Sequence, residues 1–404
     1  MANSLTPIDV YAIVNAMSRQ MFGSSALQAV DTTTFATVGE TMLRTSKENT
    51  LDAFYAVMGP TIVAVRPYTG ALRLIVQIPE EWGGISRKIS FYAKGLQPSG
   101  NWNTNLNPNQ LVDGQSVDHY VISKKYPLQL NFCGIKTEEY EDTTFLHQLN
   151  VAFRSPEEFA RFTEGKMVDI ANDVETKTEA DNTLLLLNAM GATYNTGATR
   201  QKVNLTAAFN AEFRTTYTTA QLLSTQFKEF MAYFVERVQG DIKLAAKRNE
   251  LFHVYPARND DAGNALVLPR HTPESLGRLM LYMPIIRRAE KEIFPSLFND
   301  NYLKFEQFEG VEYWQSPLSG SEINVTPNQM DPTTGNSVDG SNVNLEVVLG
   351  FYFDRDALAS SLKYQSAMTT PINARGKYYN TYYSWAHCWK MDQTENMILY
   401  YMAD

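Results

Sequence analysis

The sequence predicts an α+β fold, because strand-like and helix-like segments occupy separate stretches of its 404 residues. Alternating apolar residues indicate strands in 61–150 and again in 346–404, and a long helical pattern lies between them at 155–187. The composition is that of a globular protein, with 44% hydrophobic and 20% charged residues. A disordered chain is therefore excluded, and the length allows two or three domain-sized units or one elaborate subunit.

Charge and cysteine content narrow the class of protein. The net charge of −9, without a basic block, argues against a nucleic-acid-wrapping protein, which needs many Lys and Arg residues to replace phosphate counterions. Only Cys133 and Cys388 occur, which favours a reducing compartment such as cytoplasm over a disulfide scaffold. No signal peptide or membrane span is expected, and the sequons at Asn204 and Asn324 are expected to be chance matches.

The N-terminal 150 residues are predicted to form a helical arm and then a long hairpin. A helix from Pro7 is interrupted between Gly23 and Thr34, and a second helix covers 36–58. Short strands at 62–65 and 72–76 precede a hairpin with a polar, Asn-rich tip; its apolar positions include Ile89, Phe91, Val117, Val121, Leu128, Leu130 and Phe132. Such a hairpin buries little by itself, so it is expected to lie upon a neighbour.

The clearest helix begins at a capping box, Ser155 to Glu158, with Pro156 at its first position. Its apolar residues recur at helical spacing before Gly191: Phe159, Phe162, Met167, Ile170 and Val174. It is predicted to be a strut that packs on a sheet.

An α/β lobe is predicted to follow. It contains a helix from Thr219 to Gly240, a strand over 279–283, a helix over 285–298, and an exposed polar insertion over 318–344. Strands resume at 345–353, residues 356–364 are expected to be helical, and 397–402 is predicted to be a strand covered on both faces. The strand before it places bulky residues on one face: Tyr379, Tyr383, Trp385, His387, Trp389 and Met391.

No group of residues predicts catalysis or metal binding. His387 and Cys388 are neighbours on a strand and should point to opposite faces, and the other histidines (His119, His147, His253, His271) lack metal-ligand spacing. The acidic run of Glu138, Glu139, Glu141 and Asp142 is interpreted as a solvated face, and 331–339 as a polar loop without the calcium-loop pattern. No catalytic, cofactor or metal residue is assigned.

The segment 373–383 fits the pattern N-x-R-G-x-Y-x-N-x-Y-Y at Asn373, Arg375, Gly376, Tyr378, Asn380, Tyr382 and Tyr383. This pattern resembles that of major capsid proteins of phi-29-like podophages, and the long helix and the order of elements are similar too. The resemblance implies a Hong Kong 97-type capsid fold with an N-terminal arm (1–60), an extended E-loop hairpin (61–150), a peripheral domain with a spine helix (151–200), an axial domain (201–345, inserted loop 318–344) and peripheral return strands (346–404).

The function implied by the resemblance is that of a non-enzymatic shell subunit. It would form hexamers and pentamers in the host bacterial cytoplasm, work with a scaffolding protein and a portal protein, and enclose double-stranded DNA without sequence-specific binding. The expected inter-subunit residues are Asn373, Arg375, Gly376, Lys377 and Tyr378 in the C-terminal turn, and Asn101 and Trp102 at the hairpin tip. The alternatives are an encapsulin-like compartment shell, another virion structural protein, and a lectin or carbohydrate-active enzyme.

Overall fold

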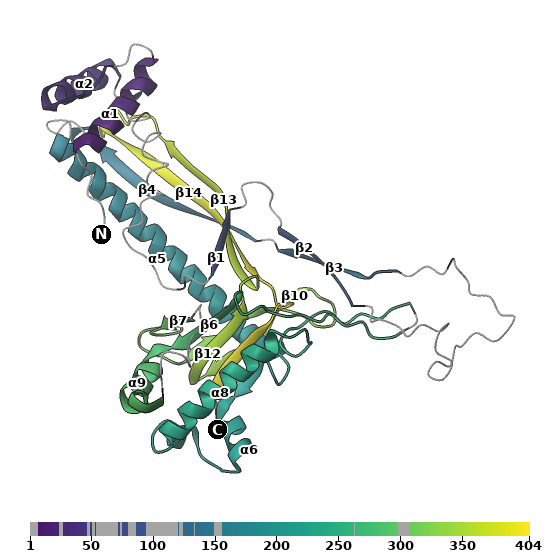
Figure 1. Ribbon diagram of the computed structural model, residues 1–404. Coiled ribbons are helices and arrows are strands. Elements are labelled where there is room, and N and C mark those ends of the chain that lie inside the picture. The colour runs from purple at the N-terminus through teal and green to yellow at the C-terminus, as the bar shows by residue number, and fades with distance from the viewer. Residues whose placement is uncertain are drawn as a thin grey trace. The chain divides into compact units, whose positions relative to one another are not determined.

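The computed structural model describes residues 7–23, 27–46, 49–50, 53, 72, 75–79, 86–93, 120, 124–132, 134–148, 156–261, 263–297 and 308–404 (Figure 1). The chain divides into two compact units, each made of several chain segments. Unit 1 contains 1–84, 134–185 and 359–390, and unit 2 contains 85–133, 186–358 and 391–404. The mixed α+β prediction is confirmed, because each unit combines its own sheet with helices.

Unit 1 is built on a four-stranded sheet in the order β1-β13-β14-β4. The strands are β1 (Val76–Pro79), β13 (Leu358–Thr369), β14 (Tyr378–Met391) and β4 (Ile135–Phe145). Strand β14 is antiparallel to β4 and keeps one register from Tyr378 opposite Phe145 to Cys388 opposite Ile135. The prediction of a helix over 356–364 is wrong. The local sequence fits a helix or a strand, and β13 forms as a strand because it pairs with β1 on one edge and β14 on the other.

The N-terminal helices α1 (Pro7–Phe22) and α2 (Thr32–Thr45) belong to the core of unit 1. Helix α2 begins earlier than predicted, because the Asp31 carboxylate accepts a hydrogen bond from the Thr34 amide at 2.7 Å and caps it. The buried residues of this core come from both helices and from β14, and include Val10, Val14, Met17, Phe35, Val38, Met42, Tyr379, Tyr383 and Trp385. The apolar faces of the arm are thus buried within its own chain.

The predicted long helix is confirmed as α5 (Pro156–Thr196), which has 41 residues (Figure 1). Its residues up to Leu185 cluster with unit 1 and the rest with unit 2. The helix continues through Gly191, where a Cβ would lie 2.9 Å from Cγ1 of Val325. Gly191 therefore permits close packing and does not end the helix. Ser155 of the predicted capping box lies outside the described residues.

Unit 2 has a five-stranded sheet in the order β5-β15-β12-β6-β7. These strands are β5 (Lys202–Asn204), β15 (Met397–Met402), β12 (Val347–Asp354), β6 (Gly277–Tyr282) and β7 (Phe308–Val311). The central strand β12 is antiparallel to both β15 and β6, whereas the edge strands β5 and β7 pair in parallel. All residues of β15 except Tyr401 are buried, which confirms the prediction of a strand covered on both faces.

Helices α6 (Leu205–Phe213), α7 (Thr219–Leu222), α8 (Phe227–Ala245) and α9 (Met283–Leu297) complete unit 2. The predicted helix from Thr219 to Gly240 is in fact two helices, and Gly240 lies inside the second, with open space around its Cα. Asn204, the first sequon residue, caps α6 by accepting hydrogen bonds from the amides of Thr206 and Ala207. The sequon is therefore explained by helix capping.

The predicted insertion over 318–344 is not an open loop. It contains two small antiparallel pairs, β8 (Ile323–Val325) with β11 (Val343–Leu345) and β9 (Asn328–Met330) with β10 (Ser337–Asp339). Side chains on the final turns of α5 hold these pairs in place. The side-chain Oδ1 of Asn188 accepts from the backbone amide of Asn328 at 2.7 Å, and the side-chain Nδ2 of Asn195 donates to the backbone carbonyl of Ser341 at 2.8 Å.

The predicted hairpin is confirmed at its base, which belongs to unit 2. Strands β2 (Ser86–Phe91) and β3 (Pro127–Phe132) are antiparallel, with Ser86 opposite Phe132 and Phe91 opposite Pro127. The Asn-rich tip, with Val117 and Val121, lies outside the described residues, as does the predicted strand at 62–65.

Candidate inter-subunit surfaces

The turn over 373–378 is rigid because its first side chain binds its backbone. The side-chain Oδ1 of Asn373 accepts hydrogen bonds from the backbone amides of Arg375 at 3.1 Å and Gly376 at 2.9 Å. A Cβ on Gly376 would lie 2.4 Å from Cε1 of Tyr378, so any larger residue here would require this ring to move. The Tyr378 ring also packs edge-on against Phe145 of β4, with centroids 5.7 Å apart. These contacts bring together the five predicted residues of this turn.

Two cations project from this turn. The side chains of Arg375 and Lys377 are exposed, and neither forms an ion pair with any residue that the structure describes. Lys377 has a backbone φ of +51°, in the left-handed region that non-glycine residues rarely adopt. The turn thus offers two positive charges to solvent. The other predicted contact residues, Asn101 and Trp102, lie outside the described residues.

The β2–β3 hairpin has two unlike faces. Side chains on one face are exposed and include Ile89 and Phe91, each 56% accessible, opposite Gln129 and Pro127. Residues Lys88 and Ser90 point the other way, toward the rest of unit 2. Ile89 and Phe91 thus form a small apolar patch on the exposed face of the hairpin.

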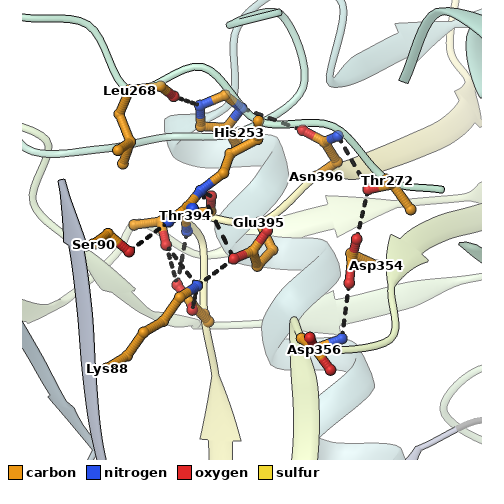
Figure 2. A network of polar contacts seen from close by, with 12 residues as sticks. Lys88, Ser90, His253, Leu268, Thr272, Asp354, Asp356, Thr394, Glu395 and Asn396 are labelled. Carbon is orange, nitrogen blue, oxygen red and sulfur yellow. Dashed lines mark hydrogen bonds and ion pairs between the residues drawn. The ribbon is translucent and has the colours of Figure 1, made fainter. Parts of the chain in front are cut away.

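The inner face of the hairpin is bound by charged and polar contacts of its own unit (Figure 2). The Lys88 ammonium forms ion pairs with both Asp392 and Glu395, and the Arg270 guanidinium donates to the Ser90 hydroxyl at 2.7 Å. Farther along the hairpin, the Tyr92 hydroxyl donates to the Pro256 carbonyl at 2.6 Å. The base of the hairpin is therefore fixed within its own chain.

The turn over 392–396, between β14 and β15, is the centre of this network (Figure 2). Asp392 accepts hydrogen bonds from the Thr394 amide at 2.9 Å and hydroxyl at 2.6 Å. The Asn396 amide donates to Thr272, whose hydroxyl donates to Asp354 at 2.7 Å. The sequence analysis missed this site. The feature of the sequence that could have indicated it is the polar block D-Q-T-E-N between two apolar strands. Four of the five residues in this block are at most 3% exposed.

The burial of this network shifts the pKa values of its members. Burial raises the pKa of the Glu395 carboxyl, although Lys88 and Arg270 oppose that shift. Burial lowers the pKa of His253, whose ring nitrogens face the Leu268 carbonyl at 2.5 Å and the Asn396 side-chain oxygen at 3.2 Å. Burial is the largest cause of both shifts, so it favours the neutral form of each of these two groups.

A groove of about 440 Å³ lies in unit 1 between α5 and strands β4 and β14. Its lining residues are Glu138, Glu139, Tyr140, Asp173, Val174, Lys177, Thr178, Asp181, Trp385 and His387. Lys136 bridges Glu138 at 2.8 Å and Asp181 at 3.0 Å, which joins strand to helix. Burial and the nearby Asp169 carboxylate raise the pKa of Tyr140 to about 12.

The acidic run is divided by the pleat of β4. Glu138 and Asp142 face α5, where they pair with Lys177 at 3.3 Å and Lys166 at 2.6 Å respectively. Glu139 and Glu141 lie on the exposed face, as predicted for the whole run. The prediction of a solvated face is thus wrong for half of the run, because side-chain direction alternates along a strand.

The residues considered for chemistry remain apart. His387 lines the groove, whereas its neighbour Cys388 is buried. Within the described ranges, no three His, Cys, Asp or Glu residues are placed to hold a metal ion. Nor does any helix among them combine the length and the apolar character that a membrane crossing requires.

Comparisons with known proteins give a likeness in fold alone. No protein-family model matches the chain, and no curated protein matches its sequence. A chain in the capsid structure of Staphylococcus phage Andhra superposes with a TM-score of 0.50 and 11% identity, over 83% of this chain and 85% of that one. A chain in the structure of the head fiber and inner core protein gp22 of bacteriophage P68 gives a TM-score of 0.50 and 9% identity, over 84% and 86%. The chain therefore shares its α+β fold with chains in bacteriophage head structures.

Proposed function

We propose that this chain is the major capsid protein of a tailed bacteriophage of the podophage type, with a Hong Kong 97-type fold. The main support for the proposal is a similarity in fold: 83% of this protein superposes on a chain of a phage capsid structure. The motif at 373–383 supports it independently, because it was identified from sequence. No catalytic role is proposed.

Unit 1 serves as the peripheral domain in this proposal, and unit 2 as the axial domain. Strands β12 and β15, which the sequence analysis assigned to the peripheral domain, then belong to the axial domain, because they lie in the sheet of unit 2. The hairpin is the E-loop, and its exposed face at Ile89 and Phe91 packs against the next copy of the chain. Burial of the 56% of each residue that is exposed would contribute about 2–3 kcal/mol for the pair, before the costs of association. Each contact is weak by itself, but every subunit in a closed shell makes several, so the shell as a whole is stable.

The cationic turn is proposed to bind a carboxylate of an adjacent copy. Arg375 and Lys377 are exposed on a rigid turn, and charge-assisted hydrogen bonds to carboxylates are the strongest polar contacts available to them. Chains of this kind are proposed to form hexamers and pentamers with the help of a scaffolding protein, and to join a portal protein. The net charge of −9 suits a wall that encloses double-stranded DNA without holding it.

The proposal is tested by negative-stain microscopy of the chain expressed in bacterial cytoplasm, alone and with a candidate scaffolding protein. Closed particles tens of nanometres wide are expected, and monomers under both conditions would refute the proposal. Phe91→Asp should abolish particles by placing a charge in the contact. Leu318→Asp, at an apolar residue that is 99% exposed, is the matched control and should leave particles intact. Particles that contain protein cargo in place of DNA would indicate an encapsulin-like compartment.

A further inference from the structure

We infer that Lys88 is a positioning residue. Its ion pairs with Asp392 and Glu395 hold the hairpin in one orientation relative to the rest of unit 2 before any second copy binds. This inference rests on the proposed function only where assembly is concerned. The hairpin, the loop that contains Arg270 and the turn over 392–396 all belong to unit 2. Their contacts are therefore properties of the single chain.

The two carboxylates depend on Lys88 because they are buried. The Asp392 side chain is fully inaccessible and that of Glu395 is 13% exposed. Asp392 has no other ion-pair partner among the described residues, and Arg270 lies 3.7 Å from Glu395. Removing one member of a buried ion pair leaves an uncompensated charge in a low-dielectric site, which is strongly unfavourable. Any rotation of the hairpin that withdraws Lys88 would have this effect.

The surface that receives Lys88 is itself rigid. Gln393 accepts a hydrogen bond from the Met330 amide at 2.5 Å and donates to the Thr196 hydroxyl at 2.9 Å. Asn396, which belongs to the same buried turn, donates from its side chain to the Thr272 hydroxyl at 3.1 Å. The turn is thus fixed from several sides, so an ion pair with it fixes the strand that carries Lys88.

A fixed inner face determines which face is offered outward. Lys88 and Ser90 alternate with Ile89 and Phe91, so holding the first pair inward keeps the second pair exposed. If only a fraction of subunits held the hairpin in this orientation, the apparent affinity between subunits would fall to that fraction of its full value. Lys88 therefore acts on assembly through the hairpin and does not itself contact the second copy.

The test compares two lysines that attach the same hairpin to unit 2. Lys88→Met breaks the buried pairs, whereas Lys124→Met breaks an exposed pair with Asp261 whose side chains are 63% and 67% accessible. Hydrogen exchange of the unassembled full chain should become at least about tenfold faster at the amides of β2 and β3 in Lys88→Met. Less than a twofold change is expected in Lys124→Met, because exposed pairs contribute little.

Two more variants separate positioning from a general loss of folding. Lys88→Arg keeps the charge and should restore most of the protection. Glu395→Gln removes only the more exposed carboxylate and should speed exchange severalfold in the hairpin while β12 stays protected. The subunit concentration above which particles form should rise about tenfold in Lys88→Met and should return to the wild-type value in Lys88→Arg.

The results distinguish the inference from the proposed function. Unchanged hairpin exchange in Lys88→Met, or equal effects of Lys88→Met and Lys124→Met, would overturn the inference even if the wild-type chain forms particles. A wild-type chain that forms no particles would refute the proposed function, while the exchange comparison would still decide the role of Lys88.

Discussion

The two sheets are stabilised differently. In unit 2, β12 is buried along seven of its eight residues, and it lies between strands that are almost wholly buried as well. In unit 1, the outward residues of β4 alternate with inward ones, and ion pairs connect the strand to α5. The sheet of unit 2 is therefore stabilised mainly by apolar packing on both of its faces. Unit 1 combines an apolar core with charged contacts that depend on pH and salt.

The largest expected effect tests the apolar core of unit 2. Phe234 on α8 is 2% exposed and meets the Tyr400 ring edge-on at 6.2 Å. Phe234→Ala should lower the free energy of unfolding by about 3–5 kcal/mol, measured by denaturant titration. Phe145→Ala is the control in unit 1: this ring is 46% exposed, so about 1 kcal/mol or less is expected. Equal losses would show that the buried core of unit 2 contributes no more to stability than a half-exposed ring.

The two glycines of α5 give a second comparison. A Cβ at Gly191 would lie 2.9 Å from Val325 and 3.2 Å from Pro327, whereas Gly165 has nothing within 4 Å. Gly191→Ala should destabilise the chain by about 1–3 kcal/mol through overpacking. Gly165→Ala should stabilise it by about 1 kcal/mol, since alanine favours the helix. Thermal unfolding of both variants measures the difference, and a shift of the same sign in both would show that packing at Gly191 is loose.

The ion pairs of unit 1 predict a pH dependence. Burial raises the pKa of the Glu138 carboxyl, but bonds from Lys136 and Lys177 outweigh it, so the pKa lies below its ordinary value of 4.5. Glu138 then contributes stability above about pH 4.5, and this contribution is lost as the pH falls through its lowered pKa. Glu138→Gln should cost about 0.5–1 kcal/mol at neutral pH and almost nothing well below pH 4. Denaturant titrations at both pH values measure this, and a pH-independent loss would contradict it.

The smallest effect is expected at an exposed pair on α2. Glu40 and Arg44 lie 2.5 Å apart, with side chains 60% and 79% accessible. Glu40→Ala should change the free energy of unfolding by no more than about 0.5 kcal/mol, and the difference should vanish in high salt. A loss comparable to that of Glu138→Gln would show that burial does not govern the strength of these pairs.

Long, regular segments were predictable from the sequence. The periodicity of α5 and the alternation in β3 each contain enough residues to identify one structure. The segment at 356–364 was not predictable, because its strand depends on partners far away in the chain. The role of Gly191 was hidden for the same reason, since it depends on Val325.

The candidate surfaces were predictable only in part. The motif at 373–383 indicated the turn, and the structure shows its Asn373 side chain binding the backbone. The contacts of Lys88 join residues more than 300 positions apart, so no local pattern could indicate them. Polar residues between two apolar strands usually indicate a solvated turn, yet the turn over 392–396 is buried.

Lys377 adopts a backbone conformation that suits glycine or asparagine better, at φ +51°. A left-handed residue of this kind carries a local cost of about 1–3 kcal/mol. Its side chain forms no ion pair with the described chain that would offset this cost. Glycine at this position would relieve that cost, and the proposed contact with a carboxylate of an adjacent copy gives the lysine a reason to be kept there.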